Sequence, residues 1–311
     1  MIKLVFLGTS EAVPSKERNH TYILLNYKDE NILIDCGEGT QRQFRKADLN
    51  PCKLTRILIT HWHGDHVLGI PGLLQTLNFS DYEKPLLIYG PKGTKEFMNQ
   101  ILKTFIFQGK FNIEVKEVGD SQVRSGSSES QAKGKFFENE DFYLEAKKMT
   151  HGVPCNAYTF VKKNKIRIDK EKLEKTKIQG PILQKLKQGK DIVYEGKKYL
   201  AKNLTYKEEG KKISFVFDTS FNKEIIPFVK NSDLLVCEST FGEELEKKAE
   251  EYHHLTSKQT AEIAKKSNSK KLILTHISQR YSKNPEQILK TAKKFFKNSF
   301  LAKDLDIVEV K

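Results

Sequence analysis

The chain has 311 residues, of which 38% are hydrophobic and 30% are charged, and its formal net charge is +14. These values are typical of a globular protein with a charged surface, and no run approaches the ~20 apolar residues that a membrane span requires. The N-terminal apolar stretch is too short for a signal peptide, and the four cysteines have no CxxC spacing: Cys36, Cys52, Cys155 and Cys237. We therefore expect a protein of the reducing cytoplasm, without a disulfide framework.

The N-terminal third alternates between strand-like and helix-like segments. Runs rich in β-branched residues and bounded by turn residues predict strands at 2–8, 21–27, 31–37, 55–61 and 85–91. Composition and apolar periodicity predict helices at 39–50, 69–80 and 92–105. The Ser- and Gly-rich segment 119–135 has no apolar periodicity and predicts a surface loop.

The remainder of the chain returns to the same alternation after a charged interruption. Strands are predicted within 142–161 and at 212–220, 233–240 and 271–278. A helix is predicted at 256–267, where Thr256 and Gln259 have the spacing of a capping box. Two sheets flanked by helices fit this order, so we expect a single domain over 1–311 with an αββα sandwich; a doubly wound parallel sheet is the main alternative.

The charge is concentrated between two predicted core strands. Residues 160–212 hold 17 Lys and Arg against 7 Asp and Glu, which leaves +10 of the net +14 in this segment. Weak apolar periodicity there predicts a flexible arm inserted at 162–210 rather than a layer of the core. A localised positive field favours a polyanionic partner such as nucleic acid or an anionic membrane surface.

The segment HWHGDH at 61–66 places four metal-ligating side chains within six positions: His61, His63, Asp65 and His66. Imidazole and carboxylate are the ligands that zinc and similar divalent ions prefer. In a loop that follows a strand, His61 and His63 can point to one side while Asp65 and His66 reach an adjacent position. One loop could therefore supply two metal ions.

Three further candidate ligands follow or end predicted strands: His151, Asp218 and His276. Taken singly, each could be a turn or capping residue, but the ends of strands on one edge of a sandwich converge in space. We expect seven ligands in two groups that share a bridging carboxylate: His61, His63 and His151 for one ion, Asp65, His66 and His276 for the other, and Asp218 between them.

The segment 61–66 and its distant partners resemble the metallo-β-lactamase superfamily, which has an αββα fold and a two-zinc site. The closer resemblance is to ribonuclease Z (tRNase Z), the family of endonucleases that mature the 3′ end of precursor tRNA. Seven segments carry it, in the family's order: LGTSEAVPSKERN (7–19), DCGEGTQRQ (35–43), HWHGDHVLGIPGLL (61–74), GPILQKLKQG (180–189), FDTS (217–220), HLTSKQTAEIA (254–264) and LILTHISQRY (272–281).

The resemblance implies hydrolysis of a phosphodiester by hydroxide, with two Zn²⁺ per subunit; Mn²⁺ or another divalent ion is possible. Asp65 would ligate one ion and hold the nucleophile's proton, while Glu238 and His254 would protonate the leaving 3′ oxygen. His253 is a competing assignment for the acid, since it directly precedes His254. Asp35 is expected to support the metal loops, and Arg18 to line the cleft or to be purely structural.

The resemblance also gives the basic arm a role. In ribonuclease Z an arm clamps the tRNA body away from the metals, and GPILQKLKQGK resembles its signature. The residues that would contact or shape this surface are Gly180, Pro181, Lys185, Lys187 and Lys190. Lysines there would contact phosphates without reading bases. The family further implies a homodimer, in which the arm of one subunit serves the active site of the other.

The sequence is compatible with three functions. The first is a zinc-dependent endoribonuclease that removes the 3′ trailer from precursor tRNA and leaves a 3′-hydroxyl. The alternative within the same superfamily is a small-molecule phosphodiesterase or arylsulfatase-like hydrolase, which has no use for a basic arm. The third is an RNA-binding protein without catalysis, which the complete ligand set argues against.

Overall fold

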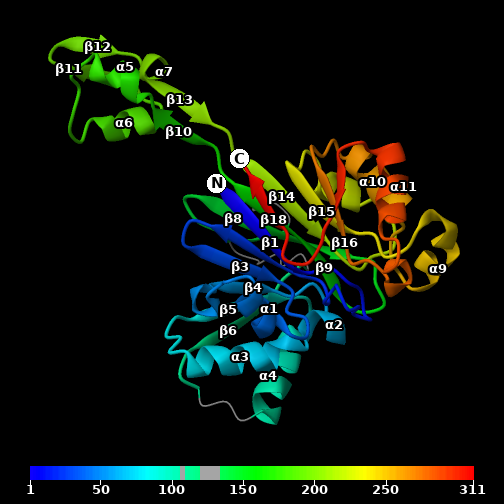
Figure 1. Ribbon diagram of the computed structural model, residues 1–311. Helices are drawn as coiled ribbons and strands as arrows, with labels where there is room; N and C mark the ends of the chain where they lie inside the picture. The colour runs from blue at the N-terminus through cyan, green and yellow to red at the C-terminus, as the bar shows by residue number, and fades with distance from the viewer. Residues whose placement is uncertain (106–108, 120–133) are drawn as a thin grey trace, which may run out of the picture. The chain divides into compact units, whose positions relative to one another are not determined.

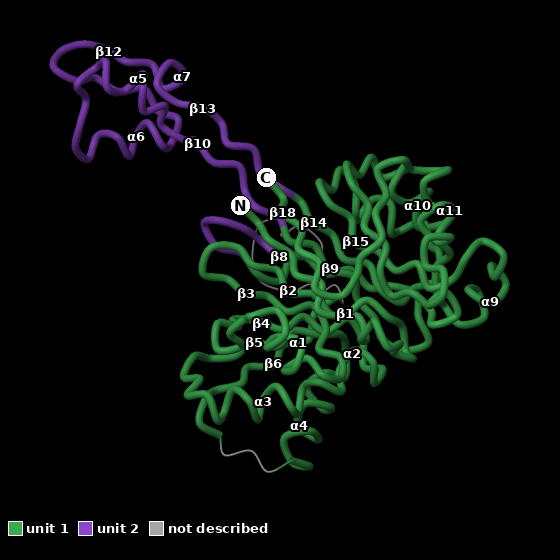
Figure 2. The backbone as a smooth tube through the Cα atoms, in the orientation of Figure 1, with its two compact units in different colours: residues 1–137, 144–160, 212–311 green, residues 138–143, 161–211 purple. Residues whose placement is uncertain are grey.

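The structure is a computed structural model that describes residues 1–105, 109–119 and 134–311 (Figure 1). The described chain divides into two compact units (Figure 2). Unit 1 comprises 1–137, 144–160 and 212–311, and unit 2 comprises 138–143 and 161–211. The loop predicted at 119–135 lies almost entirely outside the described residues.

The first sheet of unit 1 has seven strands in the order β18-β1-β2-β3-β4-β5-β6. Their bounds are β1 Ile2–Gly8, β2 Tyr22–Tyr27, β3 Glu30–Ile34, β4 Arg56–Leu58, β5 Leu86–Gly90, β6 Ile113–Glu117 and β18 Ile307–Val310. The strands from β18 to β3 pair antiparallel, and those from β3 to β6 pair parallel. The ends of β3, β4 and β5 therefore lie along one edge of this sheet.

The second sheet has the order β17-β16-β15-β14-β9-β8-β7. Its strands are β7 Lys135–Glu138, β8 Phe142–Met149, β9 Cys155–Lys162, β14 Lys211–Val216, β15 Leu234–Glu238, β16 Leu272–Thr275 and β17 Ser299–Leu301. Strands β14 to β17 are parallel neighbours. Their carboxyl ends consequently share an edge, which is where the sequence places Asp218, Glu238 and His276.

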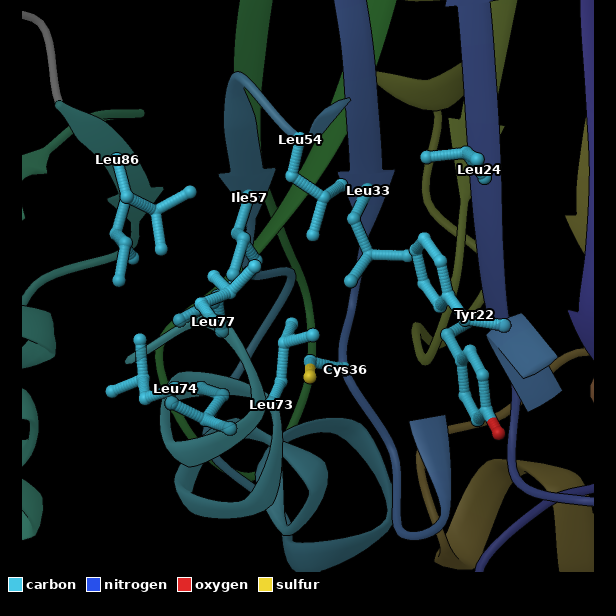
Figure 3. Packing of buried hydrophobic residues seen from close by; sticks show 14 of the residues in the cluster. Tyr22, Leu24, Leu33, Cys36, Leu54, Ile57, Leu73, Leu74, Leu77 and Leu86 are labelled. Carbon is cyan, nitrogen blue, oxygen red and sulfur yellow. The ribbon is translucent and has the colours of Figure 1, made fainter. Parts of the chain in front are cut away.

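Helices cover the outer faces of the two sheets (Figure 1). Their bounds in unit 1 are α1 Thr40–Lys46, α2 Gly64–Val67, α3 Gly69–Phe79, α4 Thr94–Thr104, α8 Ile225–Phe228, α9 Glu246–Glu251, α10 Ser257–Lys266 and α11 Glu286–Phe295, with 3₁₀ turns at Pro51–Lys53, Glu243–Leu245 and Gln279–Tyr281. Leu73 and Leu77 of α3 belong to one buried cluster with Ile57 and Leu33 of the first sheet (Figure 3). A second cluster joins α10 and α11 to the second sheet.

The inner faces of the two sheets pack against each other. The Tyr158 hydroxyl of β9 donates to the carbonyl of Ile59 across the interface at 2.7 Å, and the rings of Tyr27 and Phe160 are 5.5 Å apart. The αββα sandwich predicted from the sequence is therefore confirmed. The doubly wound alternative is wrong, because the strands divide into two sheets and the N-terminal strands pair antiparallel.

Unit 2 has a small hydrophobic core of its own. A hairpin pairs β10 (Lys165–Ile168) with β13 (Thr205–Glu208), a second pairs β11 (Ile192–Tyr194) with β12 (Lys197–Tyr199), and three short helices complete the unit: α5 Lys170–Glu174, α6 Leu183–Lys187 and α7 Ala201–Leu204. The core contains Ile178, Leu186, Ile192, Ala201 and Leu204. These core residues come from separate short elements and a loop, which is why the apolar periodicity in the sequence is weak.

Among the described residues, no helix is both long enough and apolar enough to cross a membrane.

The capping box predicted at Thr256 is present: its hydroxyl accepts from the Gln259 amide, and the Gln259 side chain accepts from the Thr256 amide. Arg18 has a structural role, because its buried guanidinium donates to the Thr9 hydroxyl and to the Ala302 carbonyl.

Candidate metal centre

All seven residues that the sequence singled out as ligands lie together where strands of the two sheets end. The loop after β4 and the following helix α2 carry His61, His63, Asp65 and His66, and the other three follow β8, β14 and β16: His151, Asp218 and His276. Four separate chain segments thus meet at one point.

The first group consists of His61, His63, His151 and Asp218. The Nδ1 atom of His63 is 3.0 Å from Nε2 of His61 and 3.2 Å from Nε2 of His151. Oδ2 of Asp218 is 3.6 Å from Nε2 of His61. Three ring nitrogens and one carboxylate oxygen therefore face a common point.

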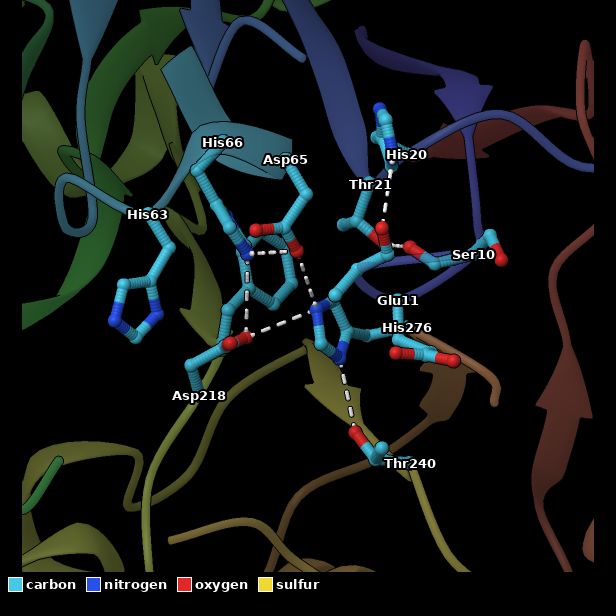
Figure 4. Close-up of polar contacts among 12 residues, drawn as sticks. Ser10, Glu11, His20, Thr21, His63, Asp65, His66, Asp218, Thr240 and His276 are labelled. Carbon is cyan, nitrogen blue, oxygen red and sulfur yellow. Dashed lines mark hydrogen bonds and ion pairs between the residues drawn. The ribbon is translucent and has the colours of Figure 1, made fainter. Parts of the chain in front are cut away.

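The second group consists of Asp65, His66, Asp218 and His276 (Figure 4). Oδ2 of Asp65 is 3.2 Å from Nε2 of His66 and 3.5 Å from Nε2 of His276. Oδ1 of Asp218 is 3.5 Å and 3.2 Å from the same two nitrogens. Asp218 presents one oxygen to each group, which is the position expected of a bridging ligand.

Buried atoms at this centre lack hydrogen-bond partners in the described structure. Nε2 of His66, Nε2 of His276 and Oδ1 of Asp218 are all inaccessible to solvent, and none has a hydrogen-bond partner among the described residues. Buried polar atoms are almost always paired, so three such atoms converging on one point fit a divalent cation. The donor set of imidazoles and carboxylates also suits zinc and similar ions.

Hydrogen bonds at Nδ1 orient His66 and His61. The Asp35 carboxylate lies 2.7 Å from Nδ1 of His66 and also accepts from the amide and the hydroxyl of Thr60. Because the Thr60 hydroxyl donates to Asp35, its oxygen can accept from Nδ1 of His61 at 3.1 Å. Both histidines therefore form these hydrogen bonds through Nδ1 and direct Nε2 into the centre.

Hydrogen bonds at Nδ1 also orient His276 and His151. The Thr240 hydroxyl donates to Oε2 of Glu238 at 2.6 Å and lies 2.9 Å from Nδ1 of His276, from which it accepts. Nδ1 of His151 lies 3.1 Å from the backbone carbonyl of His253 and donates to it. Four imidazoles are thus oriented through Nδ1, and each presents Nε2 to one of the two groups.

The backbone at the centre is strained. Asp35, Asp218 and His276 have φ angles of 59°, 40° and 58°, in the left-handed region that residues other than glycine rarely adopt. Asp218 and His276 take this conformation just past the last residues of β14 and β16. Strain of this kind is concentrated at functional sites.

The two carboxylates are held in the ionised form. Burial would raise the pKa of Asp218, but the imidazoles of His276, His66 and His61 outweigh it and hold that pKa well below its usual range. Burial of Asp65 is similarly outweighed by His66 and His276, so its pKa is lowered. Burial and the neighbouring His66 lower the pKa of His61, which keeps its imidazole neutral.

Glu238 and His254 form a pair beside the centre. Oε1 of Glu238 accepts from the Thr219 amide at 2.7 Å, and Oε2 lies 3.0 Å from Nδ1 of His254. The His254 ring is 5.4 Å from the ring of His276. Burial lowers the pKa of His254, but Glu238 and Asp218 outweigh it and raise that pKa to about 9. His253, the competing acid, is exposed and belongs to neither group.

Sequence reasoning missed Thr60 and Thr240, although each is adjacent or nearly adjacent to a predicted site residue. If these groups orient ligands as argued, Thr240→Val should lower metal affinity roughly 10–100-fold. The measurement is metal release in a graded chelator series, with Thr205→Val of unit 2 as a matched control. Unchanged metal affinity in Thr240→Val would contradict the orienting role.

The arm residues lie in unit 2, around α6. Gly180 and Pro181 precede this helix, Lys185 and Lys187 are on it, and Lys190 follows it; all five are exposed. Gly180 and Gly189 have φ angles of 85° and 75°, which glycine adopts without strain. No carboxylate of the described residues forms an ion pair with these three lysines, whereas Lys172, Lys198 and Lys207 of the same unit are paired.

The chain is similar to proteins of a known family. A family model described as Anti-Pycsar protein Apyc1 matches residues 2–172. Ribonuclease Z of Nanoarchaeum equitans is 37% identical over 99% of this chain and 93% of its own length, and that of Methanothermobacter thermautotrophicus is 40% identical over 100% and 97%.

Solved structures give the same result. Human tRNase Z, short form, has a TM-score of 0.71 and 26% identity, with 99% of each chain covered. The metallo-beta-lactamase fold protein YhfI of Bacillus subtilis, at 18% identity and a TM-score of 0.69 over 99% of this chain and 98% of its own, shares the fold.

The chain has the fold of the metallo-beta-lactamase fold proteins, and its histidines and aspartates cluster where strands of the two sheets end. Unlike the Apyc1 model, the curated relatives match the chain through its C-terminal third, where Asp218, Glu238, His254 and His276 lie. The chain belongs to the ribonuclease Z family.

Proposed function

We propose that this chain removes the 3′ trailer from precursor tRNA by hydrolysing one phosphodiester bond at the centre formed by the two groups. Family membership over almost the full length of the relatives makes it a metal-dependent endoribonuclease of tRNA 3′ processing. The convergence of His66 Nε2, His276 Nε2 and Asp218 Oδ1 without hydrogen-bond partners is the observation that supports this centre as the place of the reaction.

The proposed metal ligands are the seven residues of the two groups, with one divalent ion in each. Such a pair of ions, when bound, lowers the pKa of water and stabilises charge on the phosphate oxygens. The protein fixes the ligands beforehand through Asp35, Thr60 and Thr240, so little reorganisation is needed when charge develops.

Asp65 is proposed to hold the proton of the attacking water. Its Oδ2 atom faces the two nitrogens of His66 and His276, while no described residue hydrogen-bonds its Oδ1 atom. That free oxygen can accept a hydrogen bond from water and orient it toward the phosphorus. The depressed pKa of Asp65 keeps this oxygen an acceptor.

His254 is proposed to protonate the leaving 3′ oxygen. Glu238 binds its Nδ1 atom, so Nε2 is the edge left to face the substrate. Glu238 is itself fixed by the Thr219 amide and the Thr240 hydroxyl. A carboxylate that orients an imidazole in this way also stabilises its protonated form.

Replacing His254 by Ala should lower the rate of precursor tRNA cleavage roughly 10²–10⁴-fold, the usual contribution of a general acid. The metal content should stay at the wild-type value, because the group that His254 forms with Glu238 and His276 is not one of the two proposed metal sites. Single-turnover cleavage and metal analysis on the same sample test both statements. A variant that cleaves normally, or that loses its metal, would refute the assignment.

Unit 2 is proposed to bind the body of the tRNA through Lys185, Lys187 and Lys190. The support is that these side chains are exposed and form no ion pair with the described carboxylates, so no internal contact must be broken to bind phosphate. Phosphate contacts of this kind position a nucleic acid without reading its bases.

The direct test of the activity is cleavage of a precursor tRNA that carries a 3′ trailer. We expect one cut after the discriminator nucleotide, with a 3′-hydroxyl on the tRNA and a 5′-phosphate on the trailer, as determined by mass spectrometry of both fragments. Turnover of small phosphodiesters alone, with the precursor tRNA intact, would favour the small-molecule hydrolase instead.

A further inference from the structure

His253 is a second histidine at the centre whose side chain has no part in the scheme above. It directly precedes the proposed acid, and its ring centroid lies 6.3 Å from that of His151, compared with 5.6 Å for His254. Its imidazole is exposed and lies in no metal-binding group. Only its backbone carbonyl is used, as the acceptor for Nδ1 of His151.

The His253 side chain is present at a conformational cost. Its φ angle is 57°, in the left-handed region. Glycine would supply the same backbone carbonyl to His151 without that strain, which costs a non-glycine residue about 1–2 kcal/mol. An exposed imidazole held in a strained backbone beside a reaction centre points to a function of the ring itself.

The ring is also oriented. Its Nδ1 atom lies 3.1 Å from the Ser220 hydroxyl, and the Ser220 amide is fixed by donation to the Thr150 carbonyl at 2.8 Å. The other nitrogen, Nε2, has no hydrogen-bonding partner among the described residues. Ser220 therefore leaves Nε2 as the ring nitrogen of His253 without a partner among the described residues, and the ring centroid lies 6.3 Å from that of His151.

The leaving group of the proposed reaction identifies a substrate group that Nε2 of His253 can bind. His254 acts on the 3′ oxygen of the nucleotide that stays with the tRNA, and the neighbouring oxygen on the same ribose is the 2′-hydroxyl. A ribose hydroxyl both donates and accepts, so it matches either tautomer of an imidazole. It is also the group by which a protein distinguishes RNA from DNA at a given position.

We infer that His253, oriented by Ser220, binds the 2′-hydroxyl of the nucleotide on the 5′ side of the cut. This inference rests on the proposed function. It makes His253 a substrate-binding residue that selects ribose at the cleavage position, while the neighbouring His254 handles the 3′ oxygen of the same sugar.

The test is a double-mutant cycle between protein and substrate. The variant is His253→Gly, which keeps the backbone conformation and removes the ring, and the substrate change is a single 2′-deoxy nucleotide immediately 5′ of the cut. Each change alone should lower kcat/KM for precursor tRNA about tenfold, the worth of one hydrogen bond. Together they should lower it no further than either alone.

Two further measurements exclude a structural origin. The metal content and the thermal unfolding temperature of His253→Gly should be no lower than those of the wild type, because glycine relieves the strain. The inference would be overturned if the effects of the protein change and the substrate change on kcat/KM multiplied. It would also be overturned if His253→Gly cleaved like the wild type, or if this variant lost metal or stability. A wild-type chain that leaves all precursor tRNA uncut would instead refute the proposed function.

Discussion

Replacing His66 by Ala should reduce cleavage of precursor tRNA and hydrolysis of a small phosphodiester together, each on the order of 10³-fold. Nε2 of His66 lies 3.2 Å from Asp65 and 3.5 Å from Asp218, so its loss removes a proposed ligand from the second group. A bound divalent ion contributes several kcal/mol to transition-state stabilisation, and each 1.36 kcal/mol is a factor of ten in rate.

His66 also bonds to the buried Asp35, so its replacement could disturb the fold. His63→Ala is the variant that separates the two effects, because His63 is exposed. It should retain the wild-type circular dichroism spectrum and lose both activities. Retention of either activity by the folded His63→Ala variant would contradict the ligand assignment.

Neutralising three lysines of unit 2 should weaken the processing of precursor tRNA and leave the rate of phosphodiester hydrolysis at the metal centre unchanged. The triple variant Lys185→Ala, Lys187→Ala, Lys190→Ala should raise KM for precursor tRNA on the order of 100-fold, because three charge-assisted phosphate contacts are lost. Its hydrolysis of a small phosphodiester should stay within twofold of wild type. The slope of log KM against log salt should fall by about 3.

Unit 2 offers a matched control for this experiment. Lys172, Lys198 and Lys207 lie in the same unit but each pairs with a carboxylate. Their triple replacement by Ala removes the same formal charge and should change KM far less. Equal effects of the two triple variants would mean that general charge, and not the segment around α6, attracts the tRNA.

The sequence predicted the sandwich because its strands are separated by clear turn and helix signals. The segment 271–278, for example, ends its apolar run at His276, and the structure ends β16 at Thr275. The metal-binding candidates could also be predicted from the sequence, since side chains at the ends of neighbouring parallel strands converge. Asp218 and His276 lie in different segments of the chain but at equivalent ends of β14 and β16.

The supporting groups were harder to predict. Thr60 and Thr240 are small polar residues of ordinary sequence context, and only the fold shows that one binds Asp35 and the other binds Glu238. The core of unit 2 was missed for a related reason: Leu186 and Leu204 come from separate short helices and Ile178 from the loop between α5 and α6, so no helical or strand period connects them. The role of the two threonines and the core of unit 2 both depend on tertiary contacts, which the sequence pattern does not reveal.

The homodimer, in which the arm of one subunit would serve the active site of the other, is a proposal from family resemblance. If the proposal is correct, mixing a His63→Ala chain with the chain that carries the three lysine replacements should restore part of the activity. One active site in each mixed dimer would then combine an intact centre with an intact arm. Light scattering at several protein concentrations would give the oligomeric state.

The measurement that tests the two-group centre most directly is the number of metal ions bound per chain, determined by native mass spectrometry after loading with Zn²⁺. Because Asp218 offers one oxygen to each group, the wild type should bind two ions, His63→Ala should bind one, and Asp218→Asn should bind neither ion tightly. A single ion in the wild type, or two tightly bound ions in Asp218→Asn, would contradict the bridging role on which the account depends.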